Sequence, residues 1–282
     1  MKITGQVQIP STQFGLPPFA LARPANLDEV CAAIEKGGRP PVFLAGGTDL
    51  FLQFRSGLRP EMVIDLNTVA ELRTISLENE TLHIGAGARH AAGLTHPDIS
   101  ARLSRLAEAW ELLGNVRVRG MATLGGNLMA RNNRYEGPLF AAALNAQLCF
   151  QGPGGAAHIS AEEYWTAETP ANMVLSRIEV PLTGNPRFVY DRSLRPIMTM
   201  ALGLSDAPVG GLSARVAIGS QWNAPQFLSF GIDRLSDAQA NAQDLANVCL
   251  DELPDDLEDG DYIRSAGAAI LARLIQRIGE DT

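Results

Sequence analysis

Two short stretches of the chain carry the residue types best suited to holding a ligand by its phosphate groups. Each contains a Gly-Gly pair with a threonine nearby: Thr48 directly follows Gly46-Gly47, and Thr123 lies two residues before Gly125-Gly126. Glycine lets the backbone turn at positive φ and lets a ligand approach the main chain closely. Successive N–H groups in such a turn form a concave anion site. Two of these turns in one domain predict a site for the two phosphates of a dinucleotide.

Neither stretch matches the two commonest nucleotide-binding motifs. A P-loop would continue into Gly-Lys-Ser/Thr, and the dinucleotide fingerprint of the doubly wound fold would read Gly-x-Gly-x-x-Gly. A single Gly-Gly turn is more often structural than functional, because glycine is the default residue of tight turns. It is the occurrence of a pair that favours a binding site.

Composition narrows the classes of function. The chain of 282 residues has a net charge of −8 and no block of Lys or Arg, which argues against nucleic-acid binding. No stretch approaches the roughly 18 apolar residues of a membrane span, and the first residues lack the apolar core of a signal peptide. We therefore expect a cytoplasmic protein with no membrane contact.

The cysteines and histidines show no metal-binding spacing. Cys31, Cys149 and Cys249 stand far apart, and none of the four histidines lies at ligand spacing from another ligand. We therefore expect no metal site, no iron–sulfur cluster held by this chain alone, and buried free thiols. Any redox chemistry must then come from an organic cofactor.

The hydrophobic pattern places both Gly-Gly stretches in the first two thirds of the chain. Asn26 is the expected N-cap of a helix over 27–36, and residues 116–119 are expected to run extended into the second turn. Segment 49–53 fits either a helix or a strand. We expect further helices at 100–113 and 138–145, and strands at 42–44, 62–66, 71–76, 81–85, 147–150, 157–160 and 173–180.

The texture of the sequence changes after a linker at 181–186. Strand-like runs at 188–191, 199–204 and 212–218 precede two helical stretches at 236–250 and 261–277. Strands followed by helices predict a small α+β domain.

The order, separation and surroundings of the two stretches resemble a known family. Leu44-Ala45-Gly46-Gly47-Thr48-Asp49-Leu50 and Ala122-Thr123-Leu124-Gly125-Gly126-Asn127 resemble the two FAD-binding motifs of the medium subunit of molybdenum hydroxylases. This is the xanthine dehydrogenase and carbon monoxide dehydrogenase flavoprotein-subunit family. The resemblance covers residues 14–182 well and the remainder loosely.

The resemblance implies an α+β protein with FAD as cofactor. Residues 1–182 would form a two-subdomain FAD-binding fold of the PCMH/vanillyl-alcohol-oxidase type, split near 66–70, and 187–282 a C-terminal α+β domain. Glu136 stands where the family usually has an Asp that binds hydroxyls of the flavin chain; the alternative is a surface-loop carboxylate. The implied cofactor-binding residues are Leu44, Ala45, Gly46, Gly47, Thr48, Asp49, Leu50, Ala122, Thr123, Gly125, Gly126, Asn127 and Glu136.

Three places depart from the family pattern. The loop 130–135 replaces a stretch of small residues, and its Arg131 and Arg134 could pair with FAD phosphate, with carboxylates of a partner, or with solvent alone. The strand 190–195 lacks the acidic residue that commonly follows it. Trp222 could cover a flavin face, although filling the core is the better expectation.

The family resemblance also implies a function. The chain would be an electron-transfer subunit, passing electrons from the iron–sulfur clusters of a [2Fe–2S] small subunit through FAD to NAD or another acceptor. Substrate would be oxidised on a molybdopterin large subunit, so no catalytic residue for substrate is expected here. The alternatives are a stand-alone FAD-dependent reductase and a scaffold subunit that has lost the flavin.

Overall fold

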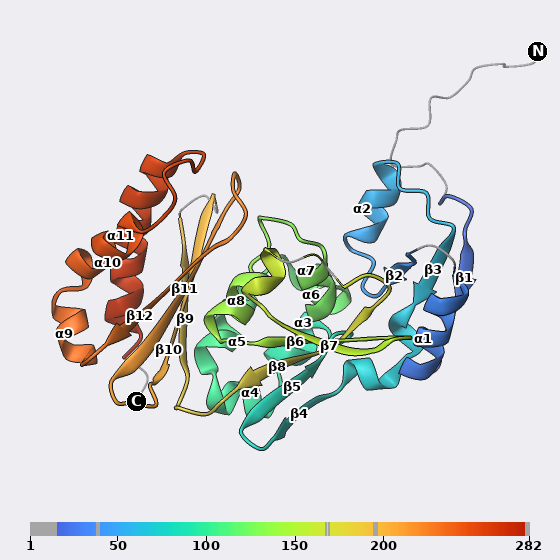
Figure 1. The fold of residues 1–282 in the computed structure, drawn as a ribbon, viewed down its shortest axis with the longest axis horizontal. Coiled ribbons are helices and arrows are strands. Elements are labelled where there is room, and N and C mark those ends of the chain that lie inside the picture. Colours follow the sequence, from blue (N-terminus) through green and yellow to red (C-terminus); the bar gives the residue numbers. More distant parts are fainter. Residues whose placement is uncertain (1–15, 38–39, 167, 169, 194–196, 280–282) are drawn as a thin grey trace, which may run out of the picture.

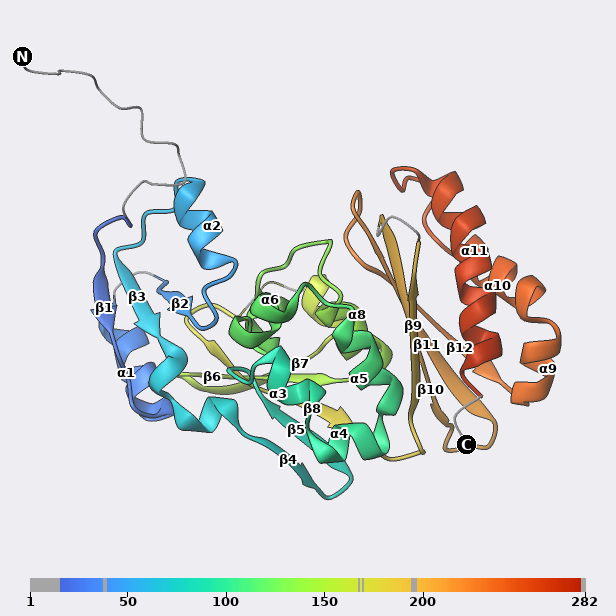
Figure 2. The same cartoon turned by 180° about the vertical axis from the view of Figure 1, so that it is seen from behind.

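The computed structural model describes residues 16–37, 40–166, 168, 170–193 and 197–279. Two earlier predictions concern residues outside this range. One is that the first residues are not a signal peptide, and the other is the end of the predicted strand 190–195. Three sheets lie in a row, with the five-stranded sheet between a small sheet at one end and a four-stranded sheet at the other (Figures 1 and 2). The five-stranded and four-stranded sheets are antiparallel with helices packed on them, which makes this an α+β arrangement.

The first unit is a parallel three-stranded sheet in the order β1-β3-β2. Asn26 accepts a hydrogen bond from the Glu29 N–H at 2.9 Å and so caps the first helix, as predicted. That helix packs Val30 and Ile34 against Ile64 of the central strand. The elements are β1 (Ala20–Ala22), α1 (Leu27–Lys36), β2 (Val42–Leu44), α2 (Leu50–Arg55) and β3 (Met62–Asp65).

The middle unit is an antiparallel five-stranded sheet in the order β4-β5-β8-β6-β7. One face packs on helices α3 to α8 around the main hydrophobic core, which includes Leu82, Leu148 and Ile178. The strands are β4 (Ile75–Glu78), β5 (Thr81–Gly85), β6 (Gln147–Gly152), β7 (Gly155–Ser160) and β8 (Val174–Pro181). The helices are α3 (His90–Leu94), α4 (Pro97–Arg102), α5 (Ser104–Glu111), α6 (Val116–Met121), α7 (Leu124–Met129) and α8 (Gly137–Ala143).

The last unit is an antiparallel sheet in the order β12-β11-β10-β9, covered on one face by three helices (Figure 1). Phe188 and Tyr190 pack its other face onto Phe140 of α8. No helix in the described residues is long and apolar enough to cross a membrane. The elements are β9 (Arg187–Arg192), β10 (Met198–Asp206), β11 (Leu212–Ser220), β12 (Gln226–Ile232), α9 (Leu235–Ala240), α10 (Ala242–Asp251) and α11 (Gly260–Arg277).

The structure corrects several predicted elements. The helix expected over 100–113 is two helices, α4 and α5, because the chain leaves helical geometry at Leu103 (φ −144°, ψ 55°). The first half of the predicted strand 71–76 is a 3₁₀ helix (Ala70–Arg73), and the sequence pattern missed β12. Segment 49–53, left open between helix and strand, forms the beginning of α2.

The approach to the second Gly-Gly stretch also differs from the expectation. Residues 116–119 belong to helix α6 rather than running extended, because Asn115 accepts hydrogen bonds from the N–H groups of Arg117 and Val118 and caps the helix. The second Gly-Gly pair lies in the first turn of helix α7 and not in a turn of its own. The two motifs are therefore alike in sequence and different in structure.

Candidate functional site

Residues of the first glycine motif, of helices α6 and α7 and of the loop before α8 line a cavity of about 680 Å³. All of the residues proposed for cofactor binding line it except Leu44, whose side chain packs against the cluster of Leu50, Phe54 and Val63. The volume is typical of a small-molecule or cofactor site. The structure thus brings both motifs and Glu136 to one site, although Asn127 and Leu50 lie far apart in sequence.

The first motif forms a tight turn between β2 and α2 that presents main-chain N–H groups. Gly47 has φ +74°, a conformation that side chains rarely adopt. The N–H groups of Gly46, Gly47 and Thr48 donate no hydrogen bond to any other described residue of the chain. A run of unpaired N–H groups beside a cavity is the arrangement that binds an anion.

The second motif contributes shape and a hydroxyl group rather than free amides. The Thr123 hydroxyl caps α7 by accepting the Gly126 N–H at 3.0 Å, and it retains its own proton for donation. Gly126 is exposed towards the cavity, so nothing but its hydrogen atoms covers the backbone there. Two further amides of the motif are already used: Leu124 donates to Ala88 and Gly125 to Ala86. The expectation that this motif offers a run of free N–H groups is wrong.

A polar clamp that sequence reasoning missed joins the two motifs. The Asn67 amide donates to the Ala45 carbonyl at 2.9 Å, and its own carbonyl accepts from Arg89 at 2.7 Å. The same guanidinium also donates to the carbonyl of Met121, just before the second motif. Asn67 and Arg89 both follow the ends of strands, and polar residues at that position are the signal that could have identified them.

Two titratable groups with shifted pKa values line the cavity. Burial raises the pKa of Glu136, whose carboxylate accepts a hydrogen bond from the Tyr190 hydroxyl at 3.5 Å. Glu136 is half-buried and lines the cavity, so the surface-loop alternative is wrong. Burial, with a smaller contribution from the charge of Arg119, lowers the pKa of His90 to about 4. His90 is therefore neutral at pH 7, and its buried Nδ1 has no hydrogen-bond partner in the described residues.

The model of one protein family, described as "FAD binding domain in molybdopterin dehydrogenase", matches residues 17–183, which is more than half of the chain. The chain belongs to this family. FAD is accordingly the cofactor of the domain, as the motifs predicted.

Known relatives of this FAD-binding domain are subunits of dehydrogenases. The chain is 30% identical over 170 residues to the carbon monoxide dehydrogenase medium chain of Hydrogenophaga pseudoflava, covering 58% of this chain and 59% of that one. It is 30% identical over 150 residues to the caffeine dehydrogenase subunit beta of Pseudomonas sp. (strain CBB1), covering 52% and 50%. The matches thus span between half and two thirds of these relatives' lengths.

The fold comparison extends over nearly the whole chain. Quinoline 2-oxidoreductase from Pseudomonas putida 86 superposes with a TM-score of 0.81 at 24% identity, covering 95% of this chain and 99% of that one. The prediction of an α+β FAD-binding fold is therefore confirmed. The assignment of individual residues to FAD contacts stays a prediction, supported by their positions around the cavity.

The loop 130–135 of this FAD-binding domain is tied to three parts of the molecule. The Arg131 guanidinium stacks over the Tyr164 ring at 4.5 Å and also donates to the Tyr164 carbonyl. Arg134 donates to the Gln221 side chain at 3.1 Å and lines the cavity, and the Tyr135 hydroxyl donates to Asp49 at 3.1 Å. Arg131 therefore makes contacts within the chain, which the three alternatives considered for it did not include.

Trp222 does not fill the hydrophobic core, which was the better expectation for it. It is half-buried, and its ring packs edge to face on Tyr262 at the start of α11, with ring centroids 6.0 Å apart. It lies outside the hydrophobic clusters of the described residues and does not line the cavity.

The structure also brings together side chains for which the sequence showed no metal-binding spacing. One potential ligand atom each from Cys149, His158 and Glu179 lies within 4.8 Å of the other two. Sequence spacing could not reveal this group, because the three residues belong to three neighbouring strands of the middle sheet, β6, β7 and β8.

Proposed function

We propose that this chain is the FAD-binding electron-transfer subunit of a multi-subunit molybdenum hydroxylase. In that role it stands between the iron–sulfur clusters of a partner chain and NAD or another electron acceptor. The observation that carries the proposal is that Gly46, Gly47 and Thr48, whose main-chain amides are unpaired in the described residues, line one cavity together with Thr123 and Gly126. Membership of the family of FAD-binding domains supports it.

The residues around the cavity fit the chemical groups of FAD. The N–H groups of Gly46, Gly47 and Thr48 suit the pyrophosphate, and Arg119 and Arg134 line the same cavity and bring positive charge to balance it. The carboxylates of Asp49 and Glu136 supply acceptors for hydroxyl groups. FAD supplies the redox chemistry when bound, and the protein contributes position and electrostatics.

The proposed partners are a [2Fe–2S] small subunit and a molybdopterin large subunit. A [2Fe–2S] cluster takes four cysteine thiolates, and these 282 residues contain three cysteines in separate parts of the fold. Redox centres other than FAD would therefore be held by other chains. The names of the relatives, which are medium chains and subunits of dehydrogenases, support such a division of labour.

The first test is the flavin content of the purified full chain. We expect a yellow protein with about one FAD per chain, measured by absorbance after release of the flavin. A chain that stays colourless after incubation with FAD refutes the proposal and favours the flavin-free scaffold. Co-expression with candidate small and large chains then tests assembly: a complex that reduces NAD or a dye with substrate, while the isolated chain does not, supports the electron-transfer role.

One observation favours a second candidate function, a stand-alone flavin reductase. Such an enzyme needs a proton donor in the cavity, and the half-buried Glu136 carboxyl has a raised pKa and lies there with Tyr190 as its neighbour. Turnover of NAD(P)H with a small soluble substrate by the isolated chain would support this function over the first.

A further inference from the structure

The outer face of the middle sheet carries a group of metal-ligand side chains away from the cofactor cavity. On β6, Leu148 and Phe150 point into the main core, and Cys149 between them points to the other face. Cys149 is buried, yet it belongs to none of the hydrophobic clusters in the described residues. The Cys149 thiol lies beside polar side chains and not among the apolar side chains of the core.

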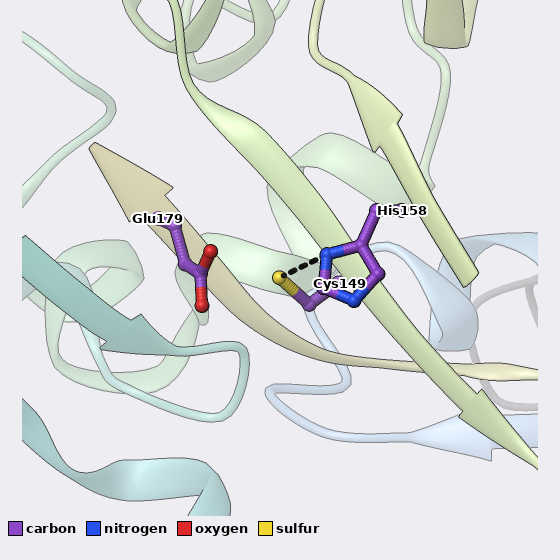
Figure 3. Close-up of side chains that lie close together, drawn as sticks. All are labelled: Cys149, His158 and Glu179. Atoms are coloured by element: carbon purple, nitrogen blue, oxygen red, sulfur yellow. Dashed lines mark hydrogen bonds between the residues drawn. The ribbon is translucent and has the colours of Figure 1, made fainter. Parts of the chain in front are cut away.

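Those neighbours come from the two strands that flank β6. His158 of β7 is the direct cross-strand partner of Cys149, and the Cys149 Sγ lies 3.5 Å from its Nδ1. Glu179 of β8 approaches from the opposite side, so that the sulfur lies between the imidazole ring and the carboxylate (Figure 3). None of the three residues lines the cofactor cavity. The three strands are hydrogen-bonded neighbours, which fixes these side chains to one small area.

Thiolate, imidazole and carboxylate are the ligands that zinc uses in proteins. Ligand bonds of about 2.0 to 2.3 Å in tetrahedral geometry place neighbouring ligand atoms about 3.5 Å apart. The separation of the Cys149 sulfur from the His158 nitrogen already has this value. All three ligand atoms lie within 4.8 Å of one another. A small movement of the Glu179 carboxylate towards the sulfur and the nitrogen would therefore complete the site. The thiol and imidazole favour zinc over magnesium or calcium, which prefer oxygen ligands.

Two other side chains contact Glu179 and define what binding must displace. Arg177 donates to its carboxylate at 2.5 Å, and the Arg177 side chain is 48% exposed, so it can turn towards solvent. His83 Nδ1 lies 3.4 Å from Glu179 but makes no hydrogen bond with any described residue. A cation between Glu179 and Cys149 would replace the charge of Arg177 at the carboxylate.

We propose that Cys149, His158 and Glu179 form a zinc-binding site that links β6, β7 and β8 on the outer face of the middle sheet. Water occupies the fourth position, as in zinc sites with three protein ligands. The thiol proton passes to solvent when the metal binds, since the thiolate is the ligand. The site clips the β6–β7 hairpin to β8. This inference is independent of the proposed electron-transfer function.

The test is equilibrium dialysis of the full chain against Zn²⁺ after treatment with a chelator, with zinc measured by atomic absorption. We expect about one zinc per chain, and a dissociation constant raised at least about tenfold in Cys149→Ser and in His158→Asn. Cys249→Ser is the matched control, because Cys249 is also a buried free thiol but lies in α10. It should bind zinc as the parent chain does. X-ray absorption of the zinc-loaded chain should show one sulfur ligand.

Two outcomes would overturn the site: no zinc uptake by the parent chain, or uptake that both ligand variants retain with unchanged affinity. His158 is exposed, so His158→Asn should fold even if Cys149→Ser does not. Zinc should raise the melting temperature of the parent chain and leave that of His158→Asn unchanged. FAD content should be equal in the parent chain and the folded variants, which separates failure of this site from failure of the cofactor site.

Discussion

Replacing Gly46 by alanine tests whether the two motifs form one site. A Cβ atom at Gly46 would lie 2.5 Å from the carbonyl oxygen of Met121 and 2.7 Å from the Cα of Ala122. Both atoms belong to the backbone, so no side chain can rotate out of the way. The first motif and the start of the second would have to move apart.

The size of the effect follows from how firmly the opposing backbone is held. The Met121 carbonyl accepts a hydrogen bond from Arg89, and Ala122 both donates to Val118 and accepts from His90. Because this segment cannot yield freely, we expect a total cost of about 1 to 3 kcal/mol, as for other overpacked sites. If the two motifs move apart in the FAD-free protein, the clash is relieved and the free energy of unfolding falls by less. FAD binding must then bring the motifs back to their original spacing, so the remaining cost weakens FAD affinity.

Two measurements show how the cost is divided between the stability of the FAD-free protein and its affinity for FAD. Thermal unfolding of the FAD-free protein should show a melting temperature lowered by about 2 to 6 °C if the whole cost falls on stability. FAD titration should show a dissociation constant raised about 5- to 150-fold if the whole cost falls on binding. We expect a loss shared between the two quantities.

Gly120→Ala is the control for the same chemical change nearby. Gly120 lies in α6, and a Cβ atom there meets nothing within 4 Å. Alanine should stabilise the helix by up to about 1 kcal/mol and leave FAD binding unchanged. If Gly46→Ala matches the parent chain in both melting temperature and FAD affinity, the close contact between the motifs does not shape the site.

Two further predictions concern single groups at the site. Thr123→Val removes the acceptor of the Gly126 N–H and should lower the free energy of unfolding by about 1 kcal/mol in urea titrations, whereas Thr123→Ser should retain the cap. His90 has a pKa of about 4 in the folded chain, below the ordinary value of 6.5, so the unfolded chain binds an extra proton between these values. The free energy of unfolding should therefore fall by up to about 3 kcal/mol as the pH drops from 6.5 to 4, and urea titrations of His90→Gln should lack that part of the slope.

The sequence predicted the first motif well because its structure is determined locally. A short buried strand, a glycine pair and the N-terminus of a helix follow one another within a few residues, and Gly47 indeed adopts a positive φ. The helix 27–36 was equally predictable, since Asn26 and the spacing of Val30 and Ile34 are both local signals. Such features depend little on distant parts of the chain.

The second motif was misread because the same residue types serve a different purpose there. Gly125 is required by packing: a Cβ atom would lie 2.5 Å from the Ala86 side chain, a neighbour that no local pattern reveals. Thr123 caps a helix, and Asn115 turns the preceding segment into a helix as well. Gly-Gly next to threonine therefore marks a close approach of backbone, and only tertiary structure decides whether a ligand or another strand makes that approach.

The clamp formed by Asn67 and Arg89 explains how two unlike motifs can share one ligand. Asn67 holds the Ala45 carbonyl of the first motif, and Arg89 holds both Asn67 and the Met121 carbonyl before the second. Gly46 fits into the same contact, and only a residue without a side chain can do so. The first motif supplies the free amides, the second supplies an uncovered backbone surface, and the clamp fixes the distance between them. Because each part is incomplete alone, a change in any of them should affect FAD binding more than a change of equal size elsewhere in the cavity wall.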